Sequence, residues 1–321
     1  MFHAGRAFTL ALLLLVSGVL LVGLPGCDTP EKALKSTDLE YKKAKAISWY
    51  KKKEYYKAIP LLEELIGLMK GRESTEDLYY MYADANYHQG DYLISAYHFK
   101  NFYDLYPNSE KAEECLYMYA KSYEMLSPKP DLDQTYTQKA IDAFQLFLNA
   151  YPNGSFITQS NEAITNLRKK LERKALNTAE LYYRTSNYRA AAVSYANILK
   201  DFPDIEQREM VTFMIIKSYF EFADNSIPDK KAERFDETIK SYAEFKDKYP
   251  QSKYLPDADK LLAQSHFLAV QSAYEWTEIG PLDQRGTYFN TFLDEVKKHS
   301  PLITDKRETN QMTQYVEKGY Y

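Results

Sequence analysis

Glycine and cysteine are both scarce in this chain of 321 residues. Eleven residues are glycine and four of them fall in the first 26 positions, so the sequence offers few tight hairpins and no glycine-rich loop for holding phosphate. Cys27 and Cys115 are the only cysteines. If Cys27 serves another purpose, no internal disulfide can form, and packing alone must stabilise the fold.

Sequence patterns for catalysis and metal binding are also missing. The chain contains no GxSxG, HExxH or Walker pattern, and its five histidines are not spaced as metal ligands. We therefore predict a protein that is not an enzyme and that holds no metal and no cofactor. Cys115 is expected to pack as a small apolar side chain. The pairs Glu63–Glu64 and Glu113–Glu114 are expected on solvated helix faces.

Positive charge does not dominate the sequence. Arg6 is the only charged residue among the first 26, so the rest of the chain has 40 basic and 45 acidic residues, a net charge of −5. A nucleic-acid partner requires a basic surface that neutralises phosphates. The charge balance therefore argues against nucleic acid as a partner.

One long apolar run is present, and it ends at a cysteine. Arg6 precedes it, no residue from Ala7 to Leu24 is charged, and the turn-forming end "LPGC" follows. A positive start, an apolar middle and a small-residue end are typical of an export signal. The run is 18 residues long, close to the minimum of about 17 for a bilayer-spanning helix, so an uncleaved anchor is the alternative.

The four residues "LPGC" resemble the lipobox of bacterial lipoproteins, in which a leucine stands three positions before the cysteine and a small residue directly before it. The resemblance implies that Cys27 carries a diacylglyceryl group, that the chain is cleaved after Gly26, and that the new amine is acylated. Pro25 departs from the usual small or β-branched residue. We expect residues 1–26 to be a signal peptide and residues 27–37 a lipidated tether.

Apolar residues behind the leader recur at intervals of three and four, as in "KAIPLLEELIGLM" and "AAVSYANILKDF". This spacing is typical of amphipathic helices, and no stretch alternates long enough for a strand. The sequence therefore predicts an all-α protein.

Four segments have nearly the same ending: "FKNFYDLYPNS", "FQLFLNAYPNGS", "YANILKDFPD" and "YAEFKDKYPQS". In each, an aromatic residue precedes a proline, which cannot continue a helix. Four helices are expected to end there, at Pro107, Pro152, Pro203 and Pro250.

Residues counted back from these prolines follow the order of the tetratricopeptide repeat: small, aromatic, turn, aromatic, small, aromatic, apolar, proline. Ala83, Ala179 and Ala191 occupy the small positions, where two helices approach closely. We expect a solenoid of about five helix pairs, with its cap, over residues 38–270, and a helical extension and tail over 271–321.

The prolines are 45, 51 and 47 residues apart, whereas a simple array of this repeat has a period of about 34. The excess is assigned to loops at residues 127–137 and 224–236 and to one long helix over residues 158–185.

Tyrosine is abundant, with 30 residues, and it recurs at one position of the first helix in three repeats. Tyr50, Tyr87 and Tyr183 follow the packing position directly. A solenoid lines its concave face with these first helices, so the three tyrosines are candidates for a groove that binds an extended peptide. Ordinary packing between repeats is the alternative interpretation.

Five repeats behind a lipobox, with "YPNS"-type endings and long insertions, resemble the BamD family of lipoproteins from the outer-membrane β-barrel assembly machinery. The resemblance covers Cys27 to about residue 270. It implies a scaffold without enzymatic activity, tethered to the periplasmic face of the outer membrane. The implied partners are the barrel-inserting subunit BamA and unfolded outer-membrane precursors.

Two other functions are compatible with a lipoprotein of helical repeats. One is an adaptor of another envelope pathway, such as a scaffold for cell-wall hydrolases. The other is a glycan-binding lipoprotein, which the presence of only two tryptophans, Trp49 and Trp276, argues against.

Overall fold

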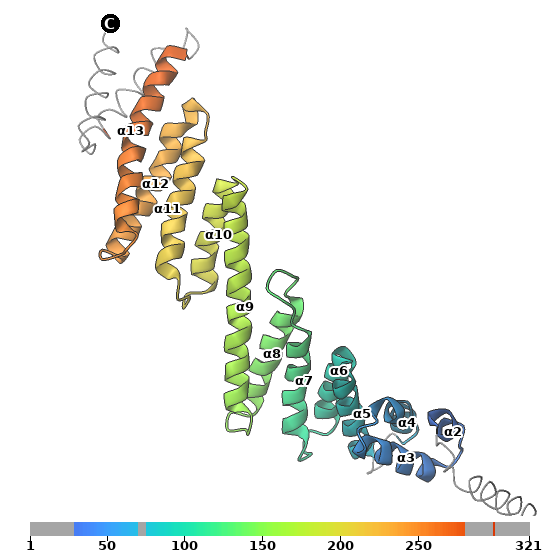
Figure 1. Ribbon diagram of the computed structural model, residues 1–321. Coiled ribbons are helices and arrows are strands. Elements are labelled where there is room, and N and C mark those ends of the chain that lie inside the picture. The colour runs from blue at the N-terminus through green and yellow to red at the C-terminus, as the bar shows by residue number, and fades with distance from the viewer. Residues whose placement is uncertain (1–28, 70–74, 280–297, 299–321) are drawn as a thin grey trace, which may run out of the picture. The chain divides into compact units, whose positions relative to one another are not determined.

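The computed structural model describes residues 29–69, 75–279 and 298. The leader and Cys27 lie outside this range, as do the predicted cleavage and lipidation. Helices account for all regular secondary structure in the described residues, which confirms the all-α prediction (Figure 1). They are α2 Pro30–Leu34, α3 Leu39–Lys51, α4 Tyr55–Leu68, α5 Thr75–Gln89, α6 Tyr92–Leu105, α7 Ala112–Leu126, α8 Thr135–Ala150, α9 Ile157–Arg184, α10 Tyr188–Asp201, α11 Arg208–Asp224, α12 Pro228–Lys248 and α13 Leu255–Ile279.

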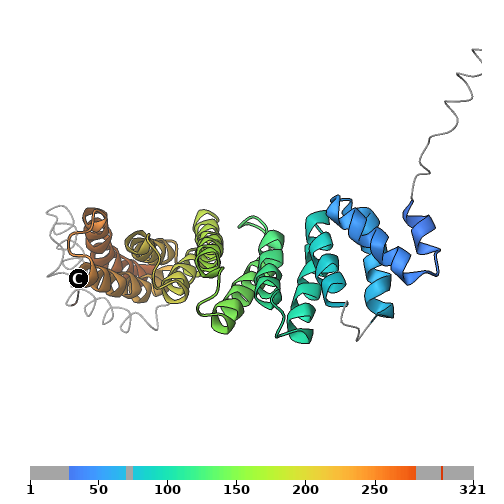
Figure 2. The same cartoon turned by 90° about the horizontal axis from the view of Figure 1, so that it is seen from below.

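These helices form five antiparallel pairs, α3–α4, α5–α6, α7–α8, α9–α10 and α11–α12, and each helix packs mainly on its neighbours in the chain (Figure 2). The chain divides into two compact units. Unit 1 contains the described residues up to Pro128 together with Asp133–Leu167, and unit 2 contains Lys129–Leu132 and the described residues from Arg168 on. The boundary falls within α9. The arrangement of paired helices is that of a tetratricopeptide-like repeat protein.

Four second helices end with the same geometry. Their C-caps, Tyr106, Tyr151, Phe202 and Tyr249, have φ angles between −126° and −133° and ψ angles between 58° and 73°. The N–H of each donates to the carbonyl four residues earlier, at 2.8 to 2.9 Å. A proline follows each cap, at positions 107, 152, 203 and 250, so the chain leaves the helix at the residue that proline disfavours in α geometry.

The turn inside three of the pairs also repeats. Lys53, Gly90 and Ser186 adopt left-handed backbone angles, with φ values of 60°, 88° and 59°. The N–H of each donates to the carbonyl three residues back, and the next N–H donates to the carbonyl five back. This is the Schellman closure of a helix C-terminus. The same bonds in three repeats fix the angle at which the second helix returns.

Small residues sit where the paired helices cross. The position twelve residues before each proline is Ser95, Ala140, Ala191 or Thr238, and all four are fully buried. Ala83 and Ala179 of the first helices are also fully buried. Aromatic and apolar side chains fill the space on either side of these contacts: Phe99, Phe102, Phe144, Phe147, Tyr195, Ile198, Tyr242 and Phe245.

Two of the three expected insertions are present, although the loop predicted over residues 127–137 is shorter because α8 begins at Thr135. A loop over residues 127–134 connects α7 to α8, and α9 is one helix of 28 residues. The predicted loop over residues 224–236 is wrong, because α12 begins at Pro228 and runs through it. Pro228 stands at the start of the helix, where a missing N–H costs nothing. The residues after it contain no glycine or proline to interrupt the helix.

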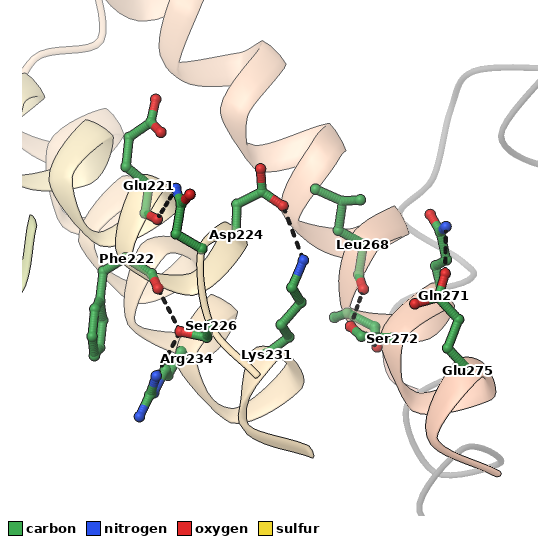
Figure 3. A network of polar contacts seen from close by, with 12 residues as sticks. Glu221, Phe222, Asp224, Ser226, Lys231, Arg234, Leu268, Gln271, Ser272 and Glu275 are labelled. Atoms are coloured by element: carbon green, nitrogen blue, oxygen red, sulfur yellow. Dashed lines mark hydrogen bonds and ion pairs between the residues drawn. The ribbon is translucent and has the colours of Figure 1, made fainter. Parts of the chain in front are cut away.

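Polar contacts close the short turn between α11 and α12 (Figure 3). Arg234 donates to the Ser226 hydroxyl at 2.6 Å and lies over the Phe222 ring, 4.4 Å from its centroid. Lys231 reaches back to Asp224 at 3.3 Å. The extra residues of this repeat therefore lengthen the helices and are tied to each other across the turn.

The two ends of the described chain are packed. Within the expected tether, residues 30–34 form α2, whose Ala33 is buried in the core of the first pair. At the other end α13 covers α11 and α12 with Ala258 and Ala269, as a capping helix does. No helix among the described residues combines the length and the apolar character needed to cross a membrane.

Candidate peptide-binding surfaces

The three tyrosines singled out in the sequence are half-buried and make the same contact in each repeat. The ring of Tyr50 meets Tyr55 edge-on at 5.7 Å between centroids, Tyr87 meets Tyr92 at 5.3 Å, and Tyr183 meets Tyr188 at 5.4 Å. Each pair spans the turn between the two helices of one repeat. The rings therefore stiffen the turn, in addition to any binding role.

Tyrosine hydroxyls also connect one repeat to the next. Tyr50 donates to Asp84 at 2.6 Å, and Tyr80 donates to Glu114 at 2.9 Å, each over 34 residues of sequence. Burial, with the neighbouring carboxylate as a further cause, raises the pKa of both phenols. A phenol that keeps its proton is a permanent donor, so these bonds persist across the physiological pH range.

Tyr183 is the predicted groove residue that borders a hollow. With Leu176, Tyr195, Met210 and Met214 it lines a cavity of about 380 Å³ formed by α9, α10 and α11 in unit 2. Burial, followed by the charge of Glu221, raises the pKa of Tyr183. Methionine side chains adapt to varied partners, and the hollow is also lined by Arg173, Asn177, Glu180, Arg184 and Gln207. This Tyr183 pocket is therefore suited to a partner segment that carries both apolar and polar side chains.

A larger hollow lies in unit 1 around α6, and we call it the α6 groove. Its volume is about 630 Å³, within the range of about 300–1,000 Å³ typical of binding pockets. Tyr119 and Tyr123 of α7 and Tyr82 of α5 are among its lining residues. The remaining lining residues are Glu63, Leu93, Ile94, Tyr97, His98, Lys100 and Asn101.

The rim of the α6 groove is apolar and exposed. Leu93 is 51% exposed, Ile94 45% and Tyr97 63%. Below them His98 stacks edge-on against Tyr82, with centroids 4.6 Å apart, and burial lowers its pKa so that the ring is neutral at pH 7. Contiguous exposed apolar side chains of this kind mark binding surfaces.

Sequence reasoning missed the α6 groove because it looked for function on the first helix of each repeat. The signal was available in "YLISAYHF". Ser95, Ala96 and Phe99 supply the buried face of α6, and Leu93, Ile94 and Tyr97 are apolar residues beyond what that face needs. A surface helix with a second apolar stripe requires a partner for it.

Several carboxylates expected in solvent are instead partners of other repeats or helices. Glu64 accepts two hydrogen bonds from the buried Lys42 ammonium, at 2.6 and 2.7 Å. Glu114 accepts from Tyr80, and Glu113 accepts from the backbone N–H of Ser155. The prediction of solvated faces was wrong for these three because the paired helix, the loop after it or the next repeat lies against faces that a lone helix would expose.

The remaining candidates for chemistry are packed side chains. Cys115 is fully buried, and burial raises the pKa of its thiol. His88 lies stacked on Tyr55, with centroids 4.8 Å apart, and 3.5 Å from Asp84. Across the part of the chain that the structure describes, no three potential metal ligands come together.

A family model described as "outer membrane lipoprotein", named YfiO, matches residues 35–222 of this chain. The chain belongs to this family of outer membrane lipoproteins. The match begins directly after α2, covers the first four repeats and ends within α11, so it includes both the α6 groove and the Tyr183 pocket.

A curated relative is similar over much of its length. A protein of Aquifex aeolicus (strain VF5), named "putative outer membrane protein assembly factor BamD", is 27% identical over 216 residues, which cover 67% of this chain and 70% of the relative. Its name places that relative in outer-membrane protein assembly.

Similar solved structures are themselves tetratricopeptide proteins. The TPR2AB domain complex of yeast Sti1 is 14% identical, with coverage of 88% of this chain and 98% of that one and a TM-score of 0.34. The TPR domain of P58(IPK) is 15% identical, with coverage of 83% and 67% and a TM-score of 0.35. Because these TM-scores are low, the fold is established by the repeating turns and helix ends of this chain and not by the superpositions.

Proposed function

We propose that this protein is a non-enzymatic scaffold of the outer-membrane β-barrel assembly machinery. It binds a barrel-inserting subunit of the BamA kind and unfolded outer-membrane protein precursors. The match of the outer membrane lipoprotein family over residues 35–222 carries the proposal. The name of the Aquifex aeolicus relative supports the assembly role.

The scaffold is held by lipid at Cys27 on the periplasmic face of the outer membrane. The "LPGC" sequence at residues 24–27 and the lipoprotein description of the family support this anchor. Each buried CH₂ of an acyl chain contributes about 0.8 kcal/mol to membrane binding, and more than one chain holds a protein firmly.

The α6 groove is the proposed site for unfolded precursors. An unfolded chain presents extended segments with exposed apolar and aromatic side chains, and it pays an ordering cost on binding that a preformed apolar surface offsets. Leu93, Ile94 and Tyr97 supply that surface, while Lys100 and Asn101 provide polar groups for the backbone of the bound segment. The Tyr183 pocket, in the C-terminal repeats, is the proposed contact for the barrel-inserting subunit.

Site-specific photo-crosslinking tests the precursor site. A photoreactive residue at Tyr97 should crosslink to an unfolded outer-membrane precursor. The matched control is Tyr56, which is almost equally exposed at 62% but lies outside the groove. Equal crosslinking from both positions, or crosslinking from neither, would contradict the assignment of the α6 groove.

A further inference from the structure

The first repeat carries a charge opposite to that of the chain as a whole. Residues 30–57 contain nine lysines and four acidic residues, a net charge of +5, whereas the chain after residue 26 has a net charge of −5. This concentration of lysine directly follows the cysteine proposed to carry lipid.

Two of these lysines form ion pairs within the first repeat. Lys42 is buried and bonded to Glu64, and Lys57 pairs with Glu54 at 3.0 Å. In contrast, Lys51 at the end of α3 and Lys52 and Lys53 in the turn that leads to α4 are all exposed. None of the three makes an ion pair with a described residue. We call them the lysine turn.

The chain itself limits how far the lysine turn can lie from the lipid. Two residues separate Cys27 from α2, so the start of that helix lies within about 11 Å of the cysteine. α2 packs against both α3 and α4, and α3 has 13 residues, which corresponds to a length of about 20 Å. The lysine turn therefore belongs to the helix pair against which the segment next to the anchor packs.

The residues beside the turn also suit a membrane interface. Tyr56, the second residue of α4, is 62% exposed, and tyrosine is enriched where bilayer and water meet because its ring is apolar and its hydroxyl polar. Lys53 adopts the left-handed backbone conformation that Gly90 adopts in the next repeat. A lysine costs more conformational free energy there than a glycine, yet the turn carries this third cation.

We propose that the lysine turn docks the first repeat onto anionic phospholipid headgroups, so that the protein meets the membrane at two points, the acyl chains and this basic surface. The proposal rests on the lipid anchor at Cys27 proposed above. Each lysine near an anionic surface strengthens binding by about fivefold. The first repeat then has a fixed orientation relative to the membrane, which an acyl anchor alone would not give it.

Vesicle binding of the non-acylated mature chain tests the lysine turn alone. The chain is purified with Cys27→Ala behind a cleavable export signal of the soluble type, and co-sedimentation is measured with phosphatidylcholine vesicles with and without phosphatidylglycerol. We expect binding only to the vesicles with phosphatidylglycerol, and loss of that binding at high salt. The triple variant K51Q/K52Q/K53Q should bind at least tenfold more weakly.

A matched variant removes three exposed lysines elsewhere. Lys200, Lys240 and Lys248 are exposed and make no ion pair with the residues described. K200Q/K240Q/K248Q should bind within about twofold of the parent, although it loses the same charge. Equal losses in the two variants, or no binding by the parent, would overturn the proposal. Labelling of the unaltered lipoprotein with radioactive palmitate tests the anchor separately. If the chain takes up palmitate but the vesicle assay shows no role for the lysine turn, the proposal of the lysine turn fails and the lipid anchor stands.

Discussion

At the scale of single residues, the turns show which backbone conformation the repeat requires. Gly90 and Ser186 both sit in left-handed geometry, yet only one is glycine. A side chain there costs about 1–2 kcal/mol, so the turn position is recognisable in the sequence only where glycine happens to occupy it. A glycine marks such a turn in the sequence, as at Gly90, whereas nothing in the sequence around Ser186 reveals the left-handed backbone.

The same substitution should therefore have opposite effects at two glycines. Neither Gly90 nor Gly67 has a neighbour that an added Cβ would meet, but Gly90 has a φ of +88° and Gly67 lies inside α4. Gly90→Ala should lower the free energy of unfolding by about 1 kcal/mol. Gly67→Ala should raise it by about 0.5 kcal/mol. Denaturant unfolding measures both, and changes of equal sign would show that the turn is not strained.

The bond from Tyr50 to Asp84 is a second prediction at this scale. Tyr50→Phe removes one hydroxyl and leaves a half-buried carboxylate without its donor, so unfolding should become easier by about 0.5–1.5 kcal/mol. Tyr56→Phe is the control, because that hydroxyl belongs to an exposed side chain. Thermal melts that shift equally for both variants would mean that Tyr50 does not link the first two repeats.

At the scale of helices, the sequence located most elements, and the errors have physical causes. α9 was identifiable because no glycine or proline interrupts it. The segment after Asp224 was assigned to a loop because asparagine, serine and proline cluster at residues 225–228, but proline at the first position of a helix starts it as readily as it ends one. The α6 groove needed the structure, because sequence spacing does not tell which of two apolar faces is buried.

The crossing of α9 and α10 gives a prediction at this scale. Ala191 is fully buried between Ala179 and Tyr195. Ala191→Trp overpacks this contact and should destabilise the protein by about 1–3 kcal/mol or more. Val193→Trp, on the same helix at a position that is 47% exposed, should change little. An unchanged melting midpoint for Ala191→Trp would show that the two helices do not approach closely there.

At the scale of the whole molecule, the lipid anchor proposed at Cys27 and the first repeat act together. α2 begins three residues after Cys27 in the sequence and is packed into the first pair, so the lipid anchor proposed at Cys27 would connect the scaffold to the membrane without a long linker. The anchor proposed at Cys27 would therefore hold the first repeat close to the bilayer.

Removing the lipid attachment residue should release the protein. Cys27→Ala is expected to leave a folded, soluble periplasmic protein, because the acyl chains provide most of the membrane affinity. Fractionation of cells checks the location, and circular dichroism checks that the helices are intact. Continued membrane anchorage through an uncleaved leader would defeat the lipoprotein interpretation and restore the alternative of a spanning anchor helix.

The most direct test of the assembly role is a detergent pull-down of the tagged protein from native membranes, with the co-purifying chains identified by mass spectrometry. We expect a large β-barrel protein with periplasmic repeat domains in stoichiometric amounts. Its recovery should fall when Met214 of the Tyr183 pocket is replaced by a charged residue. Recovery of a cell-wall hydrolase or a sugar transporter in place of the barrel protein would contradict the assembly role and leave only a lipid-anchored helical scaffold of another pathway.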